Sequence, residues 1–157
     1  MEKRITEKTQ IASLVILRLA IGWHFLYEGL VKVIDPGWSA ASFLTQAKGP
    51  LASVFINMAA NPSVLGIVDF CNQWGLVLIG FSLIAGLLSR WACIAGMLLL
   101  FLYYFSNPPF IGISNPVSEG SYLIVNKNLV ELLALWVLYM FPTEKIIGLQ
   151  RLLVGAK

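Results

Sequence analysis

The segment 11–33, with the sequence IASLVILRLAIGWHFLYEGLVKV, decides the fold class of this chain. It is long enough to cross a lipid bilayer as a single helix, which needs ~20 apolar residues. Ionisable residues interrupt it at positions Arg18, His24, Glu28 and Lys32. At ~100° of rotation per residue, these side chains fall within about 120° of one helix face. Because ionisable groups inside a bilayer almost always face a protein interior or a watery cavity, the segment predicts a membrane bundle with a polar seam.

The composition also predicts an integral membrane protein. Of the 157 residues, 58% are hydrophobic and only 12% are charged, whereas soluble domains carry ~25% charged residues. The length predicts one domain covering residues 1–157. The net charge of +3 comes from basic residues that flank the apolar runs. They form no basic stripe with interleaved aromatic residues, so we expect the lipid bilayer as a partner and no nucleic acid.

The expected architecture is all-α: an integral membrane four-helix bundle with short interfacial helices. The predicted helices cover approximately residues 11–33, 64–88, 91–107 and 125–141. Only Ser89 and Arg90 separate the second helix from the third, which should therefore be antiparallel neighbours. Residues 35–62 are too broken to span and predict short helices at the membrane surface. The amphipathic tail 143–157 is expected to lie there as well.

The distribution of lysine and arginine predicts the orientation, because cytoplasmic loops carry an excess of these residues. One side of the expected bundle holds Lys3, Arg4, Lys8, Arg90, Lys145, Arg151 and Lys157. The other side holds Lys32, Lys48 and Lys127. Both termini should therefore be cytoplasmic, and the connections 34–63 and 106–125 should face outward.

Acidic residues from three predicted helices fall at a similar depth: Glu28, Asp69 and Glu131. At a rise of 1.5 Å per residue, each lies roughly 8–10 Å inside the outer boundary. Further polar residues crowd at the same level, among them Lys32, Asn72, Lys127 and Asn128. Within each helix the polar positions are three or four residues apart and so share a face. These faces can be buried together only by pointing inward, so we expect one shared polar chamber.

Such a chamber has a structural and a functional interpretation. Buried polar contacts can simply fix which helix meets which, or they can serve a small ligand, an electron carrier or a proton path. For a functional chamber, the candidate catalytic residues are Glu28, Glu131 and His24. The candidate ligand-binding residues are Arg18, Lys32, Asp69, Asn72, Asn128 and Lys127.

Two of these candidates have competing roles. His24 could be a proton relay, a salt-bridge partner of Glu28 or a haem or metal ligand, but it is the single histidine of the chain, and we predict no metal site. Arg18 either snorkels to the inner boundary or binds an anionic group inside the bundle. No haem, flavin or nucleotide motif is visible in the sequence.

Three stretches resemble the DoxX family of membrane proteins. LRLAIGWHFLYEGLVKV (17–33) is similar to the family's opening helix, with an arginine followed by a Gly-x-x-Lys pattern. GLVLIGFSLIAGLLSRWACIAGMLLL (75–100) is similar to its second and third helices, and NKNLVELLALWVL (126–138) to its fourth. The positions that match the family motifs are Arg18, Glu28, Lys32, Asn128 and Glu131.

The resemblance implies a four-helix protein of the bacterial inner membrane. The DoxX-like group includes the DoxD subunit of thiosulfate:quinone oxidoreductase, so the expected function is that of a membrane subunit passing electrons from a sulfur compound or thiol to a quinone. Quinone is then the candidate cofactor, and a membrane or soluble redox protein the candidate partner; a homo-oligomer is left open. The alternatives are a non-catalytic subunit that recruits such a partner and a small-solute transporter.

Overall fold

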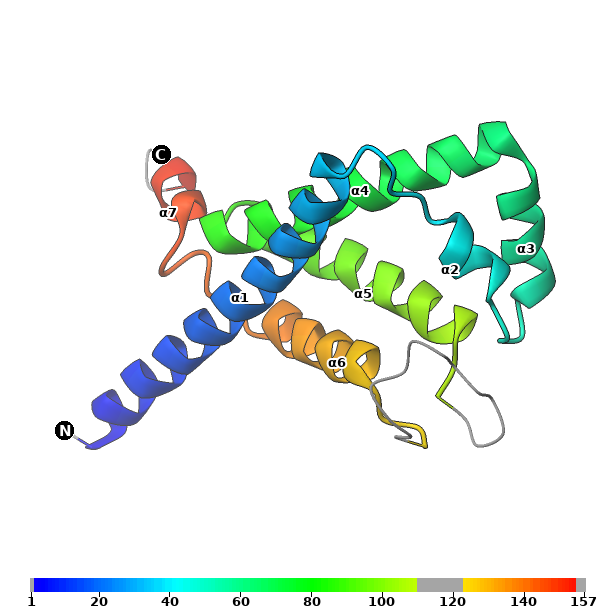
Figure 1. Cartoon of the computed structure of the whole chain (residues 1–157). Helices are drawn as coiled ribbons and strands as arrows, with labels where there is room; N and C mark the ends of the chain where they lie inside the picture. The colour runs from blue at the N-terminus through cyan, green and yellow to red at the C-terminus, as the bar shows by residue number, and fades with distance from the viewer. Residues whose placement is uncertain (1, 110–122, 155–157) are drawn as a thin grey trace.

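The computed structural model describes residues 2–109 and 123–154, and within these ranges every regular element is a helix (Figure 1). The helices are α1 (Glu2–Ile34), α2 (Ala41–Thr45), α3 (Ala52–Ala60), α4 (Pro62–Ala85), α5 (Ser89–Ser106), α6 (Lys127–Met140) and α7 (Leu149–Val154). The all-helical fold class is therefore confirmed for the described part of the chain.

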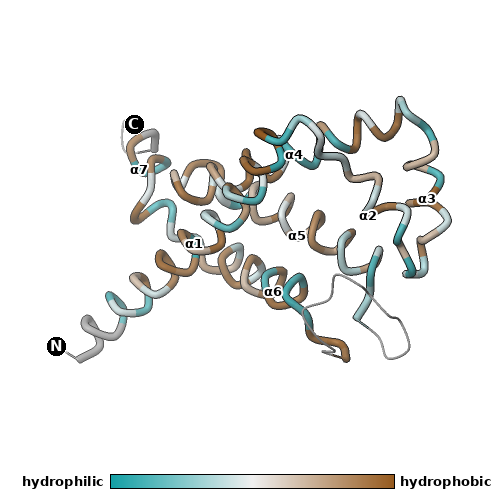
Figure 2. Tube along the Cα trace, viewed as in Figure 1, coloured by the Kyte–Doolittle hydropathy of each residue, from teal (hydrophilic) through white to brown (hydrophobic). Residues whose placement is uncertain are grey.

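Among the described residues, three helices are long and apolar enough to cross a membrane. They are Glu7–Ile34 within α1, α4 and α5, and Figure 2 shows them as largely apolar along their length. Large side chains on these helices are exposed, such as Ile67 at 65% and Trp91 at 70%. Exposed apolar groups of this size on spanning-length helices fit contact with lipid. These features fit a membrane-embedded helical protein.

The helix boundaries follow local capping signals. The Asn61 side chain accepts hydrogen bonds from the backbone N–H groups of Ser63 (3.1 Å) and Val64 (3.4 Å), with Pro62 in the first position of α4. These are the residues preferred at a helix start. At its other end, α4 stops because Gly86 adopts a left-handed conformation (φ 63°). The second predicted helix therefore begins and ends slightly before its expected bounds of 64–88.

Two terminal segments differ from the predictions. α1 begins at Glu2 rather than Ile11, because the polar N-terminal residues continue the same helix. The tail 143–157 is not one surface helix: Thr143 opens a turn in which the N–H groups of Ile146 and Ile147 bond its carbonyl, and α7 begins only at Leu149. Residues 155–157 lie outside the described range.

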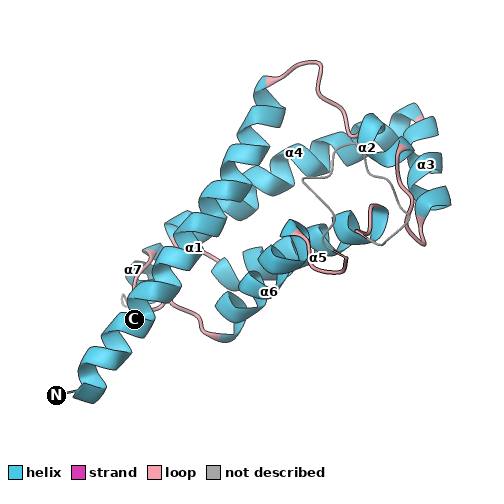
Figure 3. Cartoon of the chain, turned by 60° about the horizontal axis from the view of Figure 1, so that its bottom comes forward, coloured by secondary structure: helices cyan, strands magenta, loops and turns pink. Residues whose placement is uncertain are grey.

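The closest helix packing joins α1 to α4, through glycines on both helices. A Cβ atom at Gly80 would lie 2.6 Å from the Gly22 carbonyl oxygen and 2.7 Å from the Leu26 Cα. One at Gly29 would lie 2.7 Å from the Val77 backbone nitrogen. Small residues at such positions let helix backbones approach closely in membranes. Figure 3 shows α1 lying along α4, with α5 and α6 side by side next to them.

Candidate functional site

A cavity of about 630 Å³ lies among α1, α4, α5, α6 and the segment 38–46. Ligand pockets typically enclose 300–1,000 Å³, so the cavity is large enough for a small organic molecule. Its polar lining includes His24, Glu28, Lys32, Asn72, Gln46, Asn107, Asn126, Lys127, Asn128 and Glu131. Its aromatic lining includes Phe25, Trp38, Phe43 and Tyr103.

His24 joins α1 to α6 across this cavity. Its Nδ1 atom lies 2.7 Å from Glu131 Oε1, and its Nε2 atom lies 3.9 Å from Glu28 Oε1. Both carboxylates line the cavity, and the Glu131 side chain is 17% exposed against 45% for Glu28. Of these two contacts, the one with Glu131 is within hydrogen-bond distance, so His24 can exchange a proton directly with Glu131, while Glu28 lies near enough to influence the charge of the imidazole.

Lys32 forms a second polar centre one helical turn beyond Glu28. Its ammonium lies 3.9 Å from Glu28 Oε2 and donates a hydrogen bond to Asn72 Oδ1 at 3.2 Å. The same ammonium lies 5.1 Å from the centre of the Trp38 ring and 5.9 Å from that of Tyr103. Cation–π contacts of this length are attractive. The ammonium is thereby held at the cavity wall between a carboxylate, an amide and two aromatic rings.

Asn72 connects this centre to α5, because its side-chain amide also donates a hydrogen bond to the Tyr103 hydroxyl. Asn72 is 9% exposed, and a buried amide needs such partners. Gln73, the next residue of α4, donates to the Lys32 carbonyl oxygen at 3.1 Å. These bonds fix the relative rotation of α1, α4 and α5 around the cavity.

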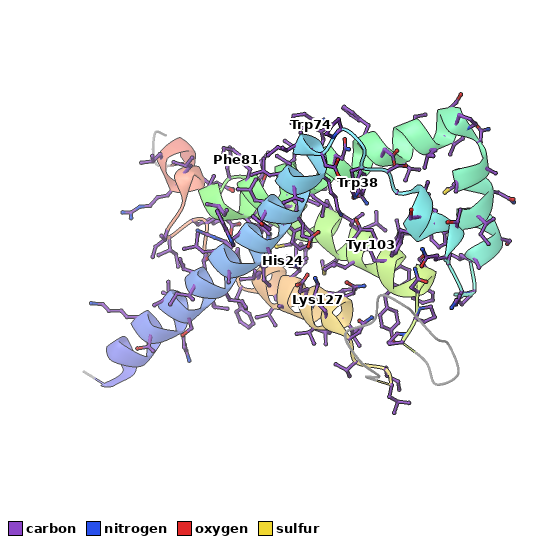
Figure 4. The ribbon with its side chains drawn as sticks, in the orientation of Figure 1. His24, Trp38, Trp74, Phe81, Tyr103 and Lys127 are labelled. Atoms are coloured by element: carbon purple, nitrogen blue, oxygen red, sulfur yellow. The ribbon has the colours of Figure 1, made fainter. Side chains whose placement is uncertain are left out.

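The start of α6 supplies the cavity residues Asn126, Lys127 and Asn128. Asn126 caps the helix, since its side chain accepts a hydrogen bond from the Leu129 N–H at 3.0 Å. Figure 4 shows His24, Tyr103 and Lys127 around the space between α1, α5 and α6, whereas Trp74 and Phe81 lie on the outer side of α4.

The structure brings most of the predicted site residues together. The predicted residues that line the cavity are His24, Glu28, Lys32, Asn72, Lys127, Asn128 and Glu131. Asp69 does not line it: its carboxylate accepts a hydrogen bond from the Ala40 N–H at 2.8 Å. Of the three acidic residues expected to share one chamber, Glu28 and Glu131 line the cavity and Asp69 does not.

Arg18 also lies apart from the cavity, at the opposite end of the bundle. Its guanidinium donates to Thr143 Oγ1 at 2.9 Å and to the Ile147 carbonyl oxygen at 2.8 Å. Arg18, Thr143 and Glu144 are all buried, with exposures of 3%, 4% and 2%. Arg18 therefore does not line the cavity; it holds the turn that follows α6.

The aromatic lining was missed by reasoning from the sequence. Tyr103 lies near a predicted helix end, where aromatic residues commonly form a belt at the membrane boundary, and Trp38 and Phe43 lie in a connection whose path no helical periodicity describes. The available signal was the position of Tyr103 on the predicted third helix at about the level of Asn72 and Lys32. Among the described residues, no group of three His, Cys, Asp or Glu side chains could hold a metal ion.

The lining combines groups that can donate or accept protons with aromatic rings, of which Trp38 and Tyr103 lie beside the Lys32 ammonium and Phe43 lies against Tyr103. In comparisons with known proteins, no family model, no curated protein and no solved structure matches this chain.

Proposed function

We propose that this chain is a DoxX-like membrane subunit of a quinone-linked oxidoreductase, and that its cavity binds the quinone headgroup. The observation that carries the proposal is the 2.7 Å contact between His24 Nδ1 and Glu131 Oε1 inside an aromatic-lined cavity. Reduction of a quinone to a quinol takes up two electrons and two protons. A site for this reaction needs proton donors beside an apolar pocket for the ring, and both are present here.

The residues have separate roles in this proposal. His24, supported by Glu131 and Glu28, delivers protons to the quinone oxygen nearest to α6. Lys32 and Tyr103 donate hydrogen bonds to the oxygen at the other end and stabilise the negative charge that develops there. Trp38 and Phe43 contact the ring. The electrons come from a thiol or another reduced sulfur compound, which is oxidised on a partner subunit.

We further propose that α6 is a fourth membrane span and that both termini are cytoplasmic, in a bacterial inner membrane. With 14 residues, α6 is short for a span. However, Glu131 near its start contacts His24, and Thr143 just after its end contacts Arg18. The chain from 131 to 143 therefore runs antiparallel to the central part of α1. The excess of lysine and arginine at the Arg18 end supports the orientation.

The test is to purify the chain from its native membrane, extract bound lipids and identify any quinone by mass spectrometry. Binding of a short-chain ubiquinone analogue and its reduction with thiosulfate or a dithiol are then measured, with any copurifying subunit retained. The proposal expects quinone in the extract and saturable analogue binding. A stable protein partner without quinone or electron transfer would instead indicate an assembly subunit, and uptake of solute into liposomes would indicate a transporter.

A further inference from the structure

The outer wall of the cavity is formed by the segment 38–46, which no long helix holds in place. From this segment the cavity is lined by Trp38, Ser39, Ala40, Ser42, Phe43 and Gln46. Its only helix within the described residues is α2, which has five residues. Helices shorter than ~12 residues are marginal without tertiary contacts. The position of this wall must therefore come from its anchors to the long helices.

The wall is anchored at both ends. At its start, the Asp69 carboxylate on α4 accepts a hydrogen bond from the N–H of Ala40, which precedes α2 and is 5% exposed. Beyond its end, the N–H groups of Lys48 and Gly49 both donate to the Ser106 carbonyl oxygen at the end of α5, at 2.9 Å. The downstream anchor includes these two backbone hydrogen bonds, whereas the upstream hydrogen bond is accepted by the Asp69 side chain.

The wall also packs on a small apolar core. This core consists of Ala40, Leu44, Ala47 and Phe55 of α3, and Trp38 packs against it. The cavity-facing contacts are made by Trp38 over the Lys32 ammonium and by Phe43, whose ring centre lies 5.4 Å from that of Tyr103. Trp38 and Phe43 lie on either side of Ala40 in the sequence, so a shift of the Ala40 backbone would move both contacts.

We propose that Asp69 is a positioning residue of the ligand cavity: by holding the Ala40 backbone, it sets Trp38 against Lys32 and Phe43 against Tyr103. The inference rests on the proposed function in taking a quinone as the ligand. Asp69 then acts as a hydrogen-bond acceptor and carries no proton to the ligand, in contrast to Glu131.

Two substitutions of Asp69 distinguish this positioning role from a proton-carrying role. Asp69→Asn keeps a side-chain oxygen that can accept the Ala40 N–H but cannot exchange protons as a carboxylate does. Asp69→Ala removes the acceptor. A positioning residue predicts that Asn preserves the site and Ala disrupts it, whereas a proton carrier predicts that both substitutions disrupt it.

The experiment measures hydrogen–deuterium exchange of the amides of residues 41–47, with the protein in lipid nanodiscs, together with the Kd of a short-chain ubiquinone analogue. In Asp69→Ala, we expect exchange to rise and analogue binding to weaken by about tenfold each, the effect of losing one hydrogen bond to a charged acceptor. Asp69→Asn should stay close to wild type in both measurements.

Asp35→Ala is the matched control. Asp35 lies in the same connection and its carboxylate accepts a hydrogen bond from the Gly37 N–H at 2.9 Å, but it does not line the cavity. Its replacement should change neither exchange nor binding. If Asp69→Ala does not fold, Ala40→Pro removes the donor of the same bond at a φ of −68° that proline adopts readily; it should raise exchange to the same extent.

Unchanged exchange in Asp69→Ala or Ala40→Pro, or an equal loss in Asp69→Asn and Asp69→Ala, would overturn the inference. Absence of analogue binding in the wild-type protein would refute the proposed quinone function instead. The exchange measurement would still decide whether Asp69 positions the wall.

Discussion

His24 Nδ1 and Glu131 Oε1 lie 2.7 Å apart and connect α1 to α6 at the cavity. The two residues are more than 100 positions apart in the sequence, and both side chains are largely removed from solvent, with exposures of 33% and 17%. An ionisable pair that costs free energy to bury and lines a cavity is a candidate for function rather than for stability alone.

Replacement of Glu131 by Gln should abolish most quinone reduction while preserving the fold. The amide can still hydrogen bond to His24, but it cannot take up a proton from the imidazole. General acid–base groups contribute about 10²- to 10⁴-fold to rates, and we expect a loss in this range in the steady-state rate. Asp35→Asn, at an exposed carboxylate in the outer connection, should behave as wild type. Full activity of Glu131→Gln would exclude the relay.

Replacement of Lys32 by Met should weaken ligand binding. The variant keeps the apolar stem, but it removes the ammonium that contacts Glu28, Asn72 and the Trp38 ring. Since a hydrogen bond from a charged group is worth about 1.5–3 kcal/mol, the Kd of a quinone analogue should rise at least tenfold in an isothermal titration. Lys8→Met, at an exposed position of the same helix, should leave the Kd unchanged.

Replacement of Gly80 by Ala should destabilise the protein. The added methyl group would collide with the backbone of α1 at Gly22 and Leu26, and overpacking of this kind costs about 1–3 kcal/mol. The melting temperature in detergent should fall clearly. Gly75→Ala, on the same helix, places its methyl group where no atom lies within 4 Å; its higher helix propensity should leave stability equal or slightly increased. Equal effects of the two substitutions would contradict this account of helix packing.

Replacement of Arg18 by Met should release the C-terminal turn. The Thr143 hydroxyl and the Ile147 carbonyl would each lose a buried donor, at a cost of about 1–3 kcal/mol per unsatisfied group. Amide exchange over residues 146–152 should rise, with a smaller effect on α1. Arg151→Met removes one exposed 3.3 Å bond to the Ile146 carbonyl and should change exchange little. Comparable exchange in the two variants would show that Arg18 does not hold this turn.

The proposed orientation can be tested by replacing the native Cys71 and Cys93 with alanine and introducing single cysteines at the exposed positions Thr45 and Lys145. A membrane-impermeant maleimide added to intact cells should label the cysteine at 45. It should label the cysteine at 145 only after the membrane is permeabilised. The reverse pattern would place both termini outside.

The long helices and many of the cavity-lining residues could be predicted from the sequence because both depend on local periodicity. Hydropathy identifies the long helices, and the spacing of His24, Glu28 and Lys32 places them on one face, where they do line the cavity. Asn72 and Glu131 followed from the same reasoning on their own helices.

The remaining features depend on how distant segments meet, which periodicity does not describe. The spacing places Asp69 on the same face of α4 as Asn72, but it does not show that the outer connection packs beside this face, and the Asp69 side chain bonds the Ala40 N–H of that connection. The close approach at Gly22, Gly29 and Gly80 requires the pairing of two helices, so neither sequence stretch reveals it alone. Trp38 and Phe43 reach the cavity through an irregular segment that only tertiary contacts position.

The glycine contacts between α1 and α4 restrict how the molecule can move. Because backbone atoms of one helix fill the space beside glycines of the other, neither helix can slide or rotate against its partner without a steric clash. The close contact therefore favours a fixed relative placement of His24, Glu28 and Lys32 on α1 and Asn72 on α4. Among the described walls, we therefore expect motion that admits or releases a ligand in the α5–α6 pair and the outer segment held by Asp69.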